Sequence, residues 1–488
     1  MKLSEILNNV DVIQVVGNAE LRDVKGVSNN SLEIKDDWIF VAIKGTKLDG
    51  HNFILEAINK NVAAVIIEEN KFDDEIFIHS NCVKILVKDS RKALAQVSKK
   101  FWSDPSSELQ LVGITGTKGK TTTSFLIKNI LDSLGDSCGM LGTISNYIGK
   151  TEYQAKLTTP ESHSINSFLR KMIDAGCAAC SMEVSSHSLE LHRVDGLNFK
   201  FAVFTNITSD HFDFHKNFKS YLKAKKKLFD MLSEESIIIY NADDPNSNEL
   251  IKDSVAVKYS FGQKTNSDFK IVDIKYDLNG TTFTLTHKEF CESFFTSLIG
   301  KFNAYNAAAA IAVAFLMGKN ISEIKNALAI AEQVPGRFEI ISNKMKKVIV
   351  DYSHTTDSLK QALEAVHHLV TNEKIYTVFG CGGNRDKLKR PEMGKVATEL
   401  SDFVYITSDN PRDEKPADII NDIISGIEKS NYKIIEKRED AIKEAILNSE
   451  KNAVVLIAGK GHENYQEISG VRKYFSDKDT AMKYLELC

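Results

Sequence analysis

The stretch Gly113-Ile-Thr-Gly-Thr-Lys-Gly-Lys-Thr-Thr-Thr123 joins an apolar run, residues 109–114, to a helical pattern, residues 124–134. A strand that turns through glycines into a helix leaves backbone N–H groups directed at an anion. Lys120 and the Thr121 hydroxyl follow at the positions that suit a phosphate and Mg²⁺. This stretch therefore predicts a nucleoside triphosphate site on an α/β sheet.

The match to the general phosphate-loop pattern is imperfect. The first glycine of that pattern is expected at position 114, which is Ile114, whereas the shorter core from Thr115 to Thr121 is intact. The alternative is a simple tight turn that requires Gly116 and Gly119 for their backbone angles. That alternative does not explain Lys120 or the three threonines that follow it. Phosphate binding is therefore the favoured interpretation.

Length and composition describe an ordinary globular chain. Its 488 residues predict about three domains, and 42% apolar residues with a net charge of −4 give no basic footprint for nucleic acid. The first residues lack a signal-peptide core and no apolar run reaches membrane-spanning length, so we expect a cytoplasmic protein. The seven cysteines are scattered, and we interpret Cys177-Ala-Ala-Cys180 as two buried thiols rather than a redox or zinc site.

Three segments are predicted, with boundaries at residues 1–106, 107–333 and 334–488. The first has short β-rich runs at 38–43, 63–68 and 83–87, and the turn between Lys44 and His51 reads as a plain loop. The third alternates strands (348–352, 375–379, 404–407, 453–458) with helices (358–369, 393–400, 417–428). This alternation predicts a doubly wound parallel sheet.

Several polar residues of the middle segment are candidates for a metal site. Glu183 ends an apolar run, where a Mg²⁺ ligand or a water-positioning group is expected in an open α/β sheet. His211, Asp213 and His215 alternate, which on a strand would suit a hydrolytic metal site, although one histidine serving Mg²⁺ fits equally well. By pattern alone, Lys225 belongs to a solvated basic helix face.

In the third segment, polar clusters follow the predicted strand ends. They are Asp351-Tyr-Ser-His354, Gly380-Cys-Gly-Gly-Asn-Arg-Asp386, Ser408-Asp-Asn-Pro-Arg412 and Gly459-Lys-Gly-His-Glu463. Ordinary strand-to-helix turns explain the glycines but not the arginines and acids, so these loops predict a binding edge.

The chain resembles the Mur ligases of peptidoglycan synthesis over essentially its whole length. The motifs that carry the resemblance stand in the family's order at residues 116–122 (GTKGKTT), 182–193 (MEVSSHSLELHR), 204–215 (FTNITSDHFDFH), 334–339 (VPGRFE), 351–359 (DYSHTTDSL), 380–394 (GCGGNRDKLKRPEMG), 408–416 (SDNPRDEKP) and 458–466 (AGKGHENYQ).

The resemblance implies three domains: an N-terminal domain that binds a UDP-linked substrate, a central ATPase domain and a C-terminal Rossmann-like domain. It implies that ATP converts the D-glutamate carboxylate of UDP-MurNAc-L-Ala-D-Glu to an acyl phosphate, which an incoming amine attacks to form an amide. A carboxylate is a poor electrophile at neutral pH, and phosphorylation supplies a leaving group.

The resemblance also implies nucleotide and metal contacts. Lys120, Glu183, His211 and Lys225 match catalytic positions, with Thr121, Glu183, His211 and Lys225 at the metal. Lys225 matches a lysine that is carbamylated in the family, and a carbamate turns a cation that would repel Mg²⁺ into an anionic oxygen ligand. The implied ATP contacts are Gly116, Thr117, Lys118, Gly119, Lys120, Thr121, Thr122, Asn306, Arg337, Asp351 and His354.

Implied contacts to the UDP-linked substrate are Ser31, Thr46, Lys47, Leu48, Thr158, Thr159, Ser185 and Arg193. The chain departs from the family pattern twice. Asn30-Ser31-Leu32 replaces the usual Asp-Ser-Arg, and Leu191 stands where a glutamine is common. The first change puts the loop geometry around uridine in question, and the second removes a contact.

The implied amino-acid contacts are Arg385, Asp409, Asn410, Pro411, Arg412, Gly459 and Glu463. The sequence Asp409-Asn-Pro-Arg412 resembles the variant that adds meso-diaminopimelate, because a second carboxylate on the substrate needs a bidentate cationic partner that L-lysine would not use. Glu463 suits the distal ammonium, and meso-lanthionine would present the same distal group.

Other functions stay open at this point. They are an L-lysine-adding Mur ligase, a folylpolyglutamate synthetase and a nucleotide-binding regulator without catalysis. We expect a monomer that binds the UDP-MurNAc-dipeptide, ATP and a diamino dicarboxylic acid, with neither a nucleic-acid partner nor a membrane span.

Overall fold

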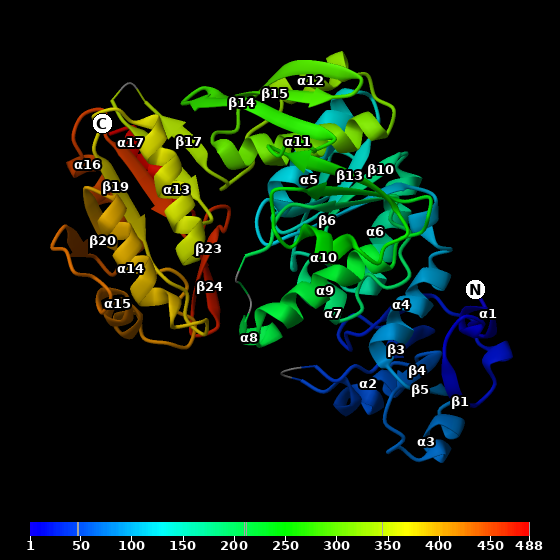
Figure 1. Ribbon diagram of the computed structural model, residues 1–488. Helices are drawn as coiled ribbons and strands as arrows, with labels where there is room; N and C mark the ends of the chain where they lie inside the picture. The colour runs from blue at the N-terminus through cyan, green and yellow to red at the C-terminus, as the bar shows by residue number, and fades with distance from the viewer. Residues whose placement is uncertain (46–47, 209, 211, 344, 488) are drawn as a thin grey trace. The chain divides into compact units, whose positions relative to one another are not determined.

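The chain places residues 110–115 in the middle of a parallel sheet. The computed structural model describes residues 1–45, 48–208, 210, 212–343 and 345–487. It divides into two compact units: residues 1–210, 215–268 and 309–319 form the first, and residues 211–214, 269–308 and 320–488 the second. Each unit is described by itself (Figure 1).

The N-terminal part of the first unit is a sheet in the order β1-β5-β4-β3-β2, parallel except for β1. Its apolar residues alternate between two cores, with Ile39 and Val41 on one face and Phe40 on the other. The elements are α1 (Leu3–Leu7), β1 (Val12–Val16), β2 (Gly26–Ser28), β3 (Trp38–Val41), α2 (Ile54–Asn59), β4 (Ala64–Ile67), α3 (Asp74–His79), β5 (Val83–Val87) and α4 (Ser90–Phe101).

The central sheet of the first unit runs in parallel in the order β13-β12-β11-β6-β10-β7, with β8 and β9 added antiparallel beyond β7. Its strands are β6 (Gln110–Thr115), β7 (Cys138–Leu141), β8 (Ser145–Ile148), β9 (Thr151–Gln154), β10 (Ala179–Glu183), β11 (Phe201–Phe204), β12 (Ile237–Asn241) and β13 (Val257–Gly262). Its helices are α5 (Lys120–Ser133), α6 (Ser162–Asp174), α7 (Ser186–Glu190), α9 (Phe218–Asp230) and α10 (Ser247–Ile251).

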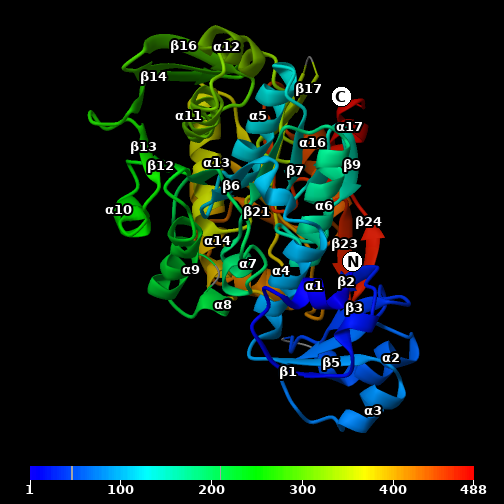
Figure 2. The ribbon, with the colours of Figure 1, turned by 90° about the vertical axis from the view of Figure 1, so that its right-hand side faces the viewer.

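The second unit begins with an antiparallel meander, and α12 packs against its last strand (Figure 2). These elements are β14 (Phe269–Asp277), β15 (Gly280–His287), β16 (Phe290–Thr296) and α12 (Ile321–Ala329). The division between the two units falls within α11 (Lys301–Leu316).

The main sheet of the second unit has the order β17-β18-β22-β19-β20-β21, and β17 alone among these strands is antiparallel to its neighbour. Ile349, Phe379 and Leu456 face the helices α13 to α15, whereas Val350 and Val378 face α16 and α17. Helices thus cover both faces, which confirms the predicted doubly wound sheet.

The elements of this sheet are β17 (Glu339–Ser342), β18 (Lys347–Asp351), α13 (Thr356–Leu369), β19 (Ile375–Phe379), α14 (Lys389–Leu400), β20 (Phe403–Ile406), α15 (Pro416–Ile424), β21 (Tyr432–Ile434), α16 (Arg438–Asn448), β22 (Val454–Ala458) and α17 (Asp477–Leu485). A separate hairpin consists of β23 (Tyr465–Ile468) and β24 (Val471–Tyr474). No helix in the described part of the chain is both long and apolar enough to cross a membrane.

The interpretation of the CxxC pair as thiols is confirmed. Cys177 and Cys180 are free and buried, and burial raises the pKa of the Cys180 thiol well above its ordinary value. A raised pKa suppresses the thiolate of Cys180, and both cysteines are packed in the interior as small side chains.

Arg438 and Asp477 form a wholly buried ion pair with Nε–Oδ1 and Nη2–Oδ2 both at 2.7 Å, and Arg438 also donates to the carbonyl of Ala458, the last residue of β22, at 3.0 Å. We expect Arg438→Met to destabilise the chain by about 3–5 kcal/mol, because it leaves the Asp477 carboxylate buried without its partner. Thermal unfolding would measure this. Lys483→Met, which breaks an exposed pair with Glu439, is the matched control. Equal unfolding midpoints for the two variants would contradict the expectation.

Candidate functional site

Two glycines shape the phosphate loop between β6 and α5. Gly116 has φ +153° and Gly119 has φ +86°. A Cβ on Gly116 would lie 1.9 Å from the Thr205 hydroxyl oxygen. A larger residue at position 116 would therefore collide with the neighbouring strand end, which explains why the turn requires glycine there.

The loop is held by residues to which the sequence assigned no role. The Thr205 hydroxyl donates to the Lys118 carbonyl at 2.6 Å, and the Asn206 side chain accepts from the Lys118 N–H and donates to its carbonyl, both at 3.0 Å. The Thr117 N–H donates to the Asn206 carbonyl at 2.8 Å. In the sequence, Thr205 and Asn206 could have been recognised as a polar pair that directly follows the apolar strand β11. Thr205 and Asn206 preorganise the loop backbone.

Lys120, Thr121 and Glu183 come together as the sequence predicts. The Lys120 ammonium donates to the Gly116 and Thr117 carbonyls at 2.9 and 3.0 Å. The Thr121 hydroxyl donates to Glu183 Oε2 at 3.0 Å, because β10 lies beside β6 with Glu183 paired to Ile114. Thr122 is buried in the first turn of α5.

The donor set around Thr121 suits Mg²⁺. A hydroxyl and a carboxylate oxygen, both on buried side chains, are the hard ligands that Mg²⁺ takes alongside waters and phosphate oxygens. Among the described residues, which leave out His211, no three His, Cys, Asp or Glu side chains form a group that could hold a metal ion. The fit therefore rests on Thr121 and Glu183.

A hydrogen-bond network extends from Glu183 to the predicted substrate residues. Thr143, which the sequence analysis missed, donates to Glu183 from its N–H at 2.8 Å and from its hydroxyl at 3.0 Å. The Thr143 and Thr158 hydroxyls lie 3.1 Å apart. Thr159 donates to the Glu183 carbonyl at 2.8 Å and accepts from the Ser185 N–H at 3.1 Å. The metal candidate and these residues thus share one buried network.

Arg193 continues the network on its other side. Its guanidinium donates to the Thr159 carbonyl at 3.2 Å and pairs with Glu161 at 2.8 Å. Arg193 is thereby held next to the turn that carries Thr158 and Thr159. The structure brings together the predicted substrate residues of the central sheet.

Lys225 is not on a solvated helix face. It is 1% exposed on the buried side of α9, where its amine donates to the Gly116 carbonyl at 2.8 Å and lies 4.6 Å from the centre of the Tyr221 ring. Burial, together with the charge of Lys120, lowers the pKa of Lys225 well below 10.5. A lowered pKa increases the neutral fraction of this amine, and the neutral form is nucleophilic.

The alternating histidine interpretation is wrong, because it needs a strand. Residues Phe212–His215 form the short helix α8 instead. The His215 ring nitrogen Nε2 lies 2.9 Å from the Ser186 hydroxyl. His211 lies outside the described residues, so its assignment stays a prediction.

The predicted loops of the second unit leave one edge of its main sheet. Asp351 and Phe379 both pair with Ala458, and Phe379 also pairs with Ile406. The segments after these four residues therefore begin at the same level, as expected for the carboxyl ends of parallel strands. The prediction of a common edge is confirmed.

Three of the predicted nucleotide residues of this unit, Arg337, Asp351 and His354, lie around Tyr352. The Arg337 guanidinium lies 4.7 Å from the centre of the Tyr352 ring, and the Phe338 N–H donates to Asp351 at 2.7 Å. Burial raises the pKa of Asp351. His354 is exposed, with Nδ1 at 2.8 Å from the Tyr352 carbonyl. Asn306, on α11, donates to the Asn303 side chain at 3.0 Å.

Contacts on two sides hold the loop from Asp409 to Arg412 in place. Arg412 takes φ +52°, and its guanidinium donates to the Gly383 carbonyl at 2.6 Å. On the other side, its N–H donates to the Glu467 carbonyl at 3.1 Å in the hairpin. The Pro411 carbonyl packs against Gly383, where a Cβ would lie only 1.9 Å away. Backbone contacts thus fix the direction of the Arg412 side chain.

Asp409 and Asn410, at the start of this loop, lie next to Gly459 and Glu463. Asn410 donates to Glu463 Oε2 at 2.8 Å. Gly459, with φ +119°, leaves room for Asp409, whose Oδ2 would lie 2.6 Å from an added Cβ. Arg385 is exposed. The two carboxylates and the amide form the polar centre of the predicted amino-acid pocket.

The remaining predicted contacts lie in the N-terminal part. Ser31 follows β2, and its carbonyl accepts from Lys60 at 2.6 Å. The Leu32 N–H donates to the Asn30 side chain at 3.1 Å, and the Leu32 side chain is exposed. Leu48 is also exposed, whereas Thr46 and Lys47 lie outside the described residues. The turn at Asn30 is therefore closed by a local Asx-type contact.

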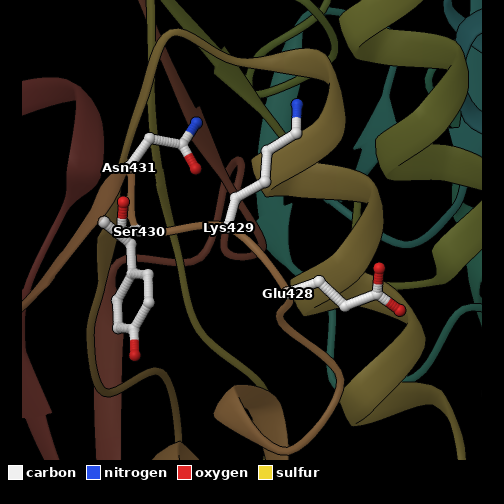
Figure 3. Close-up of a pocket in the computed structure, with 5 residues that line it drawn as sticks. Glu428, Lys429, Ser430 and Asn431 are labelled. Carbon is white, nitrogen blue, oxygen red and sulfur yellow. The ribbon is translucent and has the colours of Figure 1, made fainter.

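A hollow of about 590 Å³ lies elsewhere on the second unit (Figure 3). Residues 428–432 line it, of which the last, Tyr432, begins β21. Because β21 is parallel to β20, this is the amino-end edge of the sheet, opposite the carboxyl-end edge at which open parallel sheets bind their ligands. We assign the hollow no part in the site.

Comparison with known proteins yields one family over nearly the whole chain. The Mur ligase middle domain matches residues 114–314, the glutamate ligase domain of Mur ligases matches residues 336–461, and the catalytic domain of the Mur ligase family matches residues 23–102.

Individual relatives agree with these matches. A protein of Clostridium perfringens named UDP-N-acetylmuramoyl-L-alanyl-D-glutamate–2,6-diaminopimelate ligase is 41% identical, with all of both chains covered. A protein of Parabacteroides distasonis with the same name is 39% identical over 98% of each chain. A solved structure of a protein so named has a TM-score of 0.71 and 29% identity, covering 100% of this chain and 99% of its own.

The similarity spans every motif of the site, and the fold matches the expected α/β architecture. The chain belongs to the Mur ligase family.

Proposed function

We propose that this protein is the ATP-dependent, ADP-forming ligase that joins meso-diaminopimelate to the D-glutamate carboxylate of UDP-MurNAc-L-Ala-D-Glu in peptidoglycan precursor synthesis. The observation that carries the proposal is the 3.0 Å contact between Thr121 and Glu183. It links the phosphate loop to the network of Thr158, Thr159 and Ser185. A phosphoryl donor and a substrate carboxylate bound there would be neighbours. The names of the relatives support the same reaction.

The chemistry proceeds in two steps. The substrate carboxylate oxygen attacks the γ-phosphorus of ATP, the bond to the bridging oxygen breaks, and ADP leaves with that electron pair. The neutral amine then attacks the acyl phosphate carbonyl carbon, the carbon–oxygen bond to the phosphoryl group breaks, inorganic phosphate leaves with that electron pair, and the nitrogen loses one proton as the amide forms. Lys120 would neutralise the charge that develops on the transferred phosphoryl group.

The proposed metal ligands are Thr121, Glu183, His211 and Lys225 as its carbamate. Mg²⁺ held there would offset the negative charge of the ATP phosphates. The neutral Lys225 amine would attack CO₂, lose one proton and become an anionic carbamate. Its burial beside Lys120 supports this step, because both effects favour the neutral amine.

The nucleotide and substrate contacts that the resemblance to the family implies are part of the same proposal. ATP would contact residues 116–122 with Asn306, Arg337, Asp351 and His354, and the UDP-linked substrate would contact Ser31, the 46–48 loop, Thr158, Thr159, Ser185 and Arg193. Domain boundaries at 1–106, 107–333 and 334–488 are supported by the ranges of the three family matches. A monomeric state and a cytoplasmic location stay predictions.

The amino-acid pocket favours a dicarboxylic diamino acid over L-lysine. Arg412 is directed by contacts on both sides of its loop, and a guanidinium there suits a distal carboxylate. Glu463 suits the distal ammonium. meso-Lanthionine presents the same distal group and is an equal candidate by chemistry, whereas a folylpolyglutamate synthetase would have no use for this arrangement.

Phosphate release from ATP tests the proposal. With UDP-MurNAc-L-Ala-D-Glu present, we expect release with meso-diaminopimelate or meso-lanthionine and little with L-lysine or L-ornithine. Release with L-lysine would keep the reaction class and overturn the pocket assignment. No release with any of the four amines would favour a different acceptor or a regulator without catalysis.

A further inference from the structure

Lys460 is a wholly buried lysine within the predicted amino-acid pocket, at 0% exposure. Gly459 and Gly461, with φ +119° and +52°, turn the loop on both sides of it. A Cβ on Gly461 would lie 2.6 Å from the Gly336 carbonyl oxygen, so the loop has little room to change its path. The backbone therefore commits the Lys460 side chain to the interior.

The Lys460 ammonium lies among three predicted ligand residues. It donates to the Asn410 side-chain oxygen at 3.1 Å and to Glu463 Oε2 at 3.3 Å, and it lies 3.9 Å from Asp409 Oδ1. The Tyr465 ring centre is 5.4 Å away. A buried charge needs such partners, and here they are the residues proposed to hold the substrate.

The contacts of Lys460 fix the orientation of Asn410. The Asn410 side-chain oxygen accepts from Lys460 and also from the Glu467 N–H at 3.0 Å. Its amide nitrogen therefore faces Glu463 Oε2 at 2.8 Å. Two donors, Lys460 and Asn410, thus converge on a single oxygen of Glu463.

The other oxygen of Glu463 is differently placed. Oε1 accepts a longer contact of 3.4 Å from the Tyr352 hydroxyl. A carboxylate has about four acceptor sites, so Oε1 retains capacity for a further donor. Among the described residues, Oε2 accepts from two donors, whereas Oε1 accepts only the longer contact from Tyr352. Oε1 is therefore the oxygen that Glu463 can offer to a substrate.

We propose that Lys460 is a positioning residue that holds Asn410 and Glu463 so that Glu463 offers Oε1 to the distal ammonium of the amino-acid substrate. Lys460 itself does not touch the substrate in this arrangement. The inference rests on the proposed function and deepens it, because it explains how an uncharged or wrongly spaced side chain would be rejected. Such a substrate would leave Oε1, on a side chain that is only 16% exposed, without a cationic partner from the substrate.

The test compares steady-state kinetics of Lys460→Met, which keeps the length of the stem, with those of Lys460→Arg. For Lys460→Met we expect KM for meso-diaminopimelate to rise about tenfold, as for the loss of one charge-assisted contact, while kcat and KM for ATP stay within about twofold. Lys460→Arg should recover part of the loss. Unchanged KM in Lys460→Met, or an equal loss in every parameter, would overturn the inference.

A double-mutant cycle with Glu463→Gln separates positioning from general damage. If Lys460 acts through Glu463, Lys460→Met should add little to the effect of Glu463→Gln, whereas independent effects would multiply and contradict the inference. Lys346→Met is the matched control, because Lys346 is also buried in this unit but donates to the carbonyls of Ile446 and Leu447 at the end of α16. Its KM for the amino acid should not change.

Two outcomes keep this test distinct from that of the proposed function. If the unsubstituted protein releases no phosphate with meso-diaminopimelate, the proposed function fails before any variant is compared. If the unsubstituted protein is active and the variants show no selective KM change, the positioning role fails alone. Should Lys460→Met not fold, the comparison of Lys460→Arg with Glu463→Gln and their double variant decides the question.

Discussion

Lys225→Ala is expected to abolish ligase activity, with a loss of at least about 10²–10³-fold in kcat, the cost of removing one preorganised electrostatic group from an active site. The amine of Lys225 lies 2.8 Å from the Gly116 carbonyl, at the base of the phosphate loop. The carbamate proposed there would be lost with the side chain. Phosphate release at saturating substrates measures the effect.

Carbon dioxide supplies a sharper test of the same residue. Depleting CO₂ should lower the activity of the unsubstituted protein, and bicarbonate should restore it, whereas bicarbonate should not rescue Lys225→Ala. At a fixed concentration of dissolved CO₂, recovery should be faster at higher pH, because the neutral fraction of the amine rises as pH passes upward through the lowered pKa of Lys225.

The matched control for Lys225 is its neighbour Lys227. Lys227→Ala removes the same side chain two residues away, where it is partly exposed and pairs with Glu190 at 2.8 Å. Activity within about twofold of the unsubstituted protein is expected for this surface pair. A fully active Lys225→Ala protein would refute the carbamate assignment.

The strands and strand-end loops could be predicted from sequence because their signals are local. The run 375–379 coincides with β19, and 83–87 coincides with β5. Both are short, apolar and bounded by polar residues, as buried parallel strands require. The glycine pattern of the phosphate loop likewise placed Lys120 and Thr121 at the start of α5 without tertiary information.

Helix beginnings were harder to predict. The pattern indicated a helix from Met393, yet α14 begins at Lys389. Pro391 lies in the first turn of α14, where proline is tolerated because its missing N–H costs no hydrogen bond. The hairpin β23–β24 was also missed, although Ser469 and Gly470, both with positive φ, form the kind of turn that favours two-residue hairpins.

Side-chain partners across the sheet could not be read from the sequence. Thr143 bonds to Glu183, which is 40 positions further along the chain, and Asn206 bonds to Lys118, which is 88 positions earlier. Lys225 shows the same limit, since a lysine-rich helix pattern does not reveal which lysine faces inward. Only the resemblance to the Mur ligases separated it from its neighbours, and the structure shows that it is buried.

The second variant with a large expected effect is Arg412→Ala, which should change the specificity for the amino-acid substrate rather than the rate of the chemical step. Its guanidinium donates to the Gly383 carbonyl at 2.6 Å, and its backbone is tied to the hairpin through Glu467 and Ser469. A residue held this firmly keeps its charge in one place. Little conformational entropy of the Arg412 side chain is therefore lost when a substrate carboxylate binds to it.

Arg412→Ala should raise KM for meso-diaminopimelate about 10- to 100-fold, as for the loss of a hydrogen bond between charged groups worth about 1.5–3 kcal/mol. KM for ATP and for the UDP-linked substrate should change little. Arg412→Lys should recover only part of the loss, because an ammonium cannot pair with a carboxylate through two parallel bonds. Steady-state kinetics with each substrate varied in turn measures all three values.

Arg472→Ala is the control for Arg412, since it removes an exposed arginine from the neighbouring hairpin, where it pairs with Glu467 at 3.3 Å. Its KM for meso-diaminopimelate should stay within about twofold. The discriminating substrate is L-lysine, which lacks the distal carboxylate. If Arg412→Ala weakens meso-diaminopimelate and leaves any residual use of L-lysine unchanged, Arg412 reads that carboxylate. If both amino acids lose equally, Arg412 supports the loop and another residue sets the specificity.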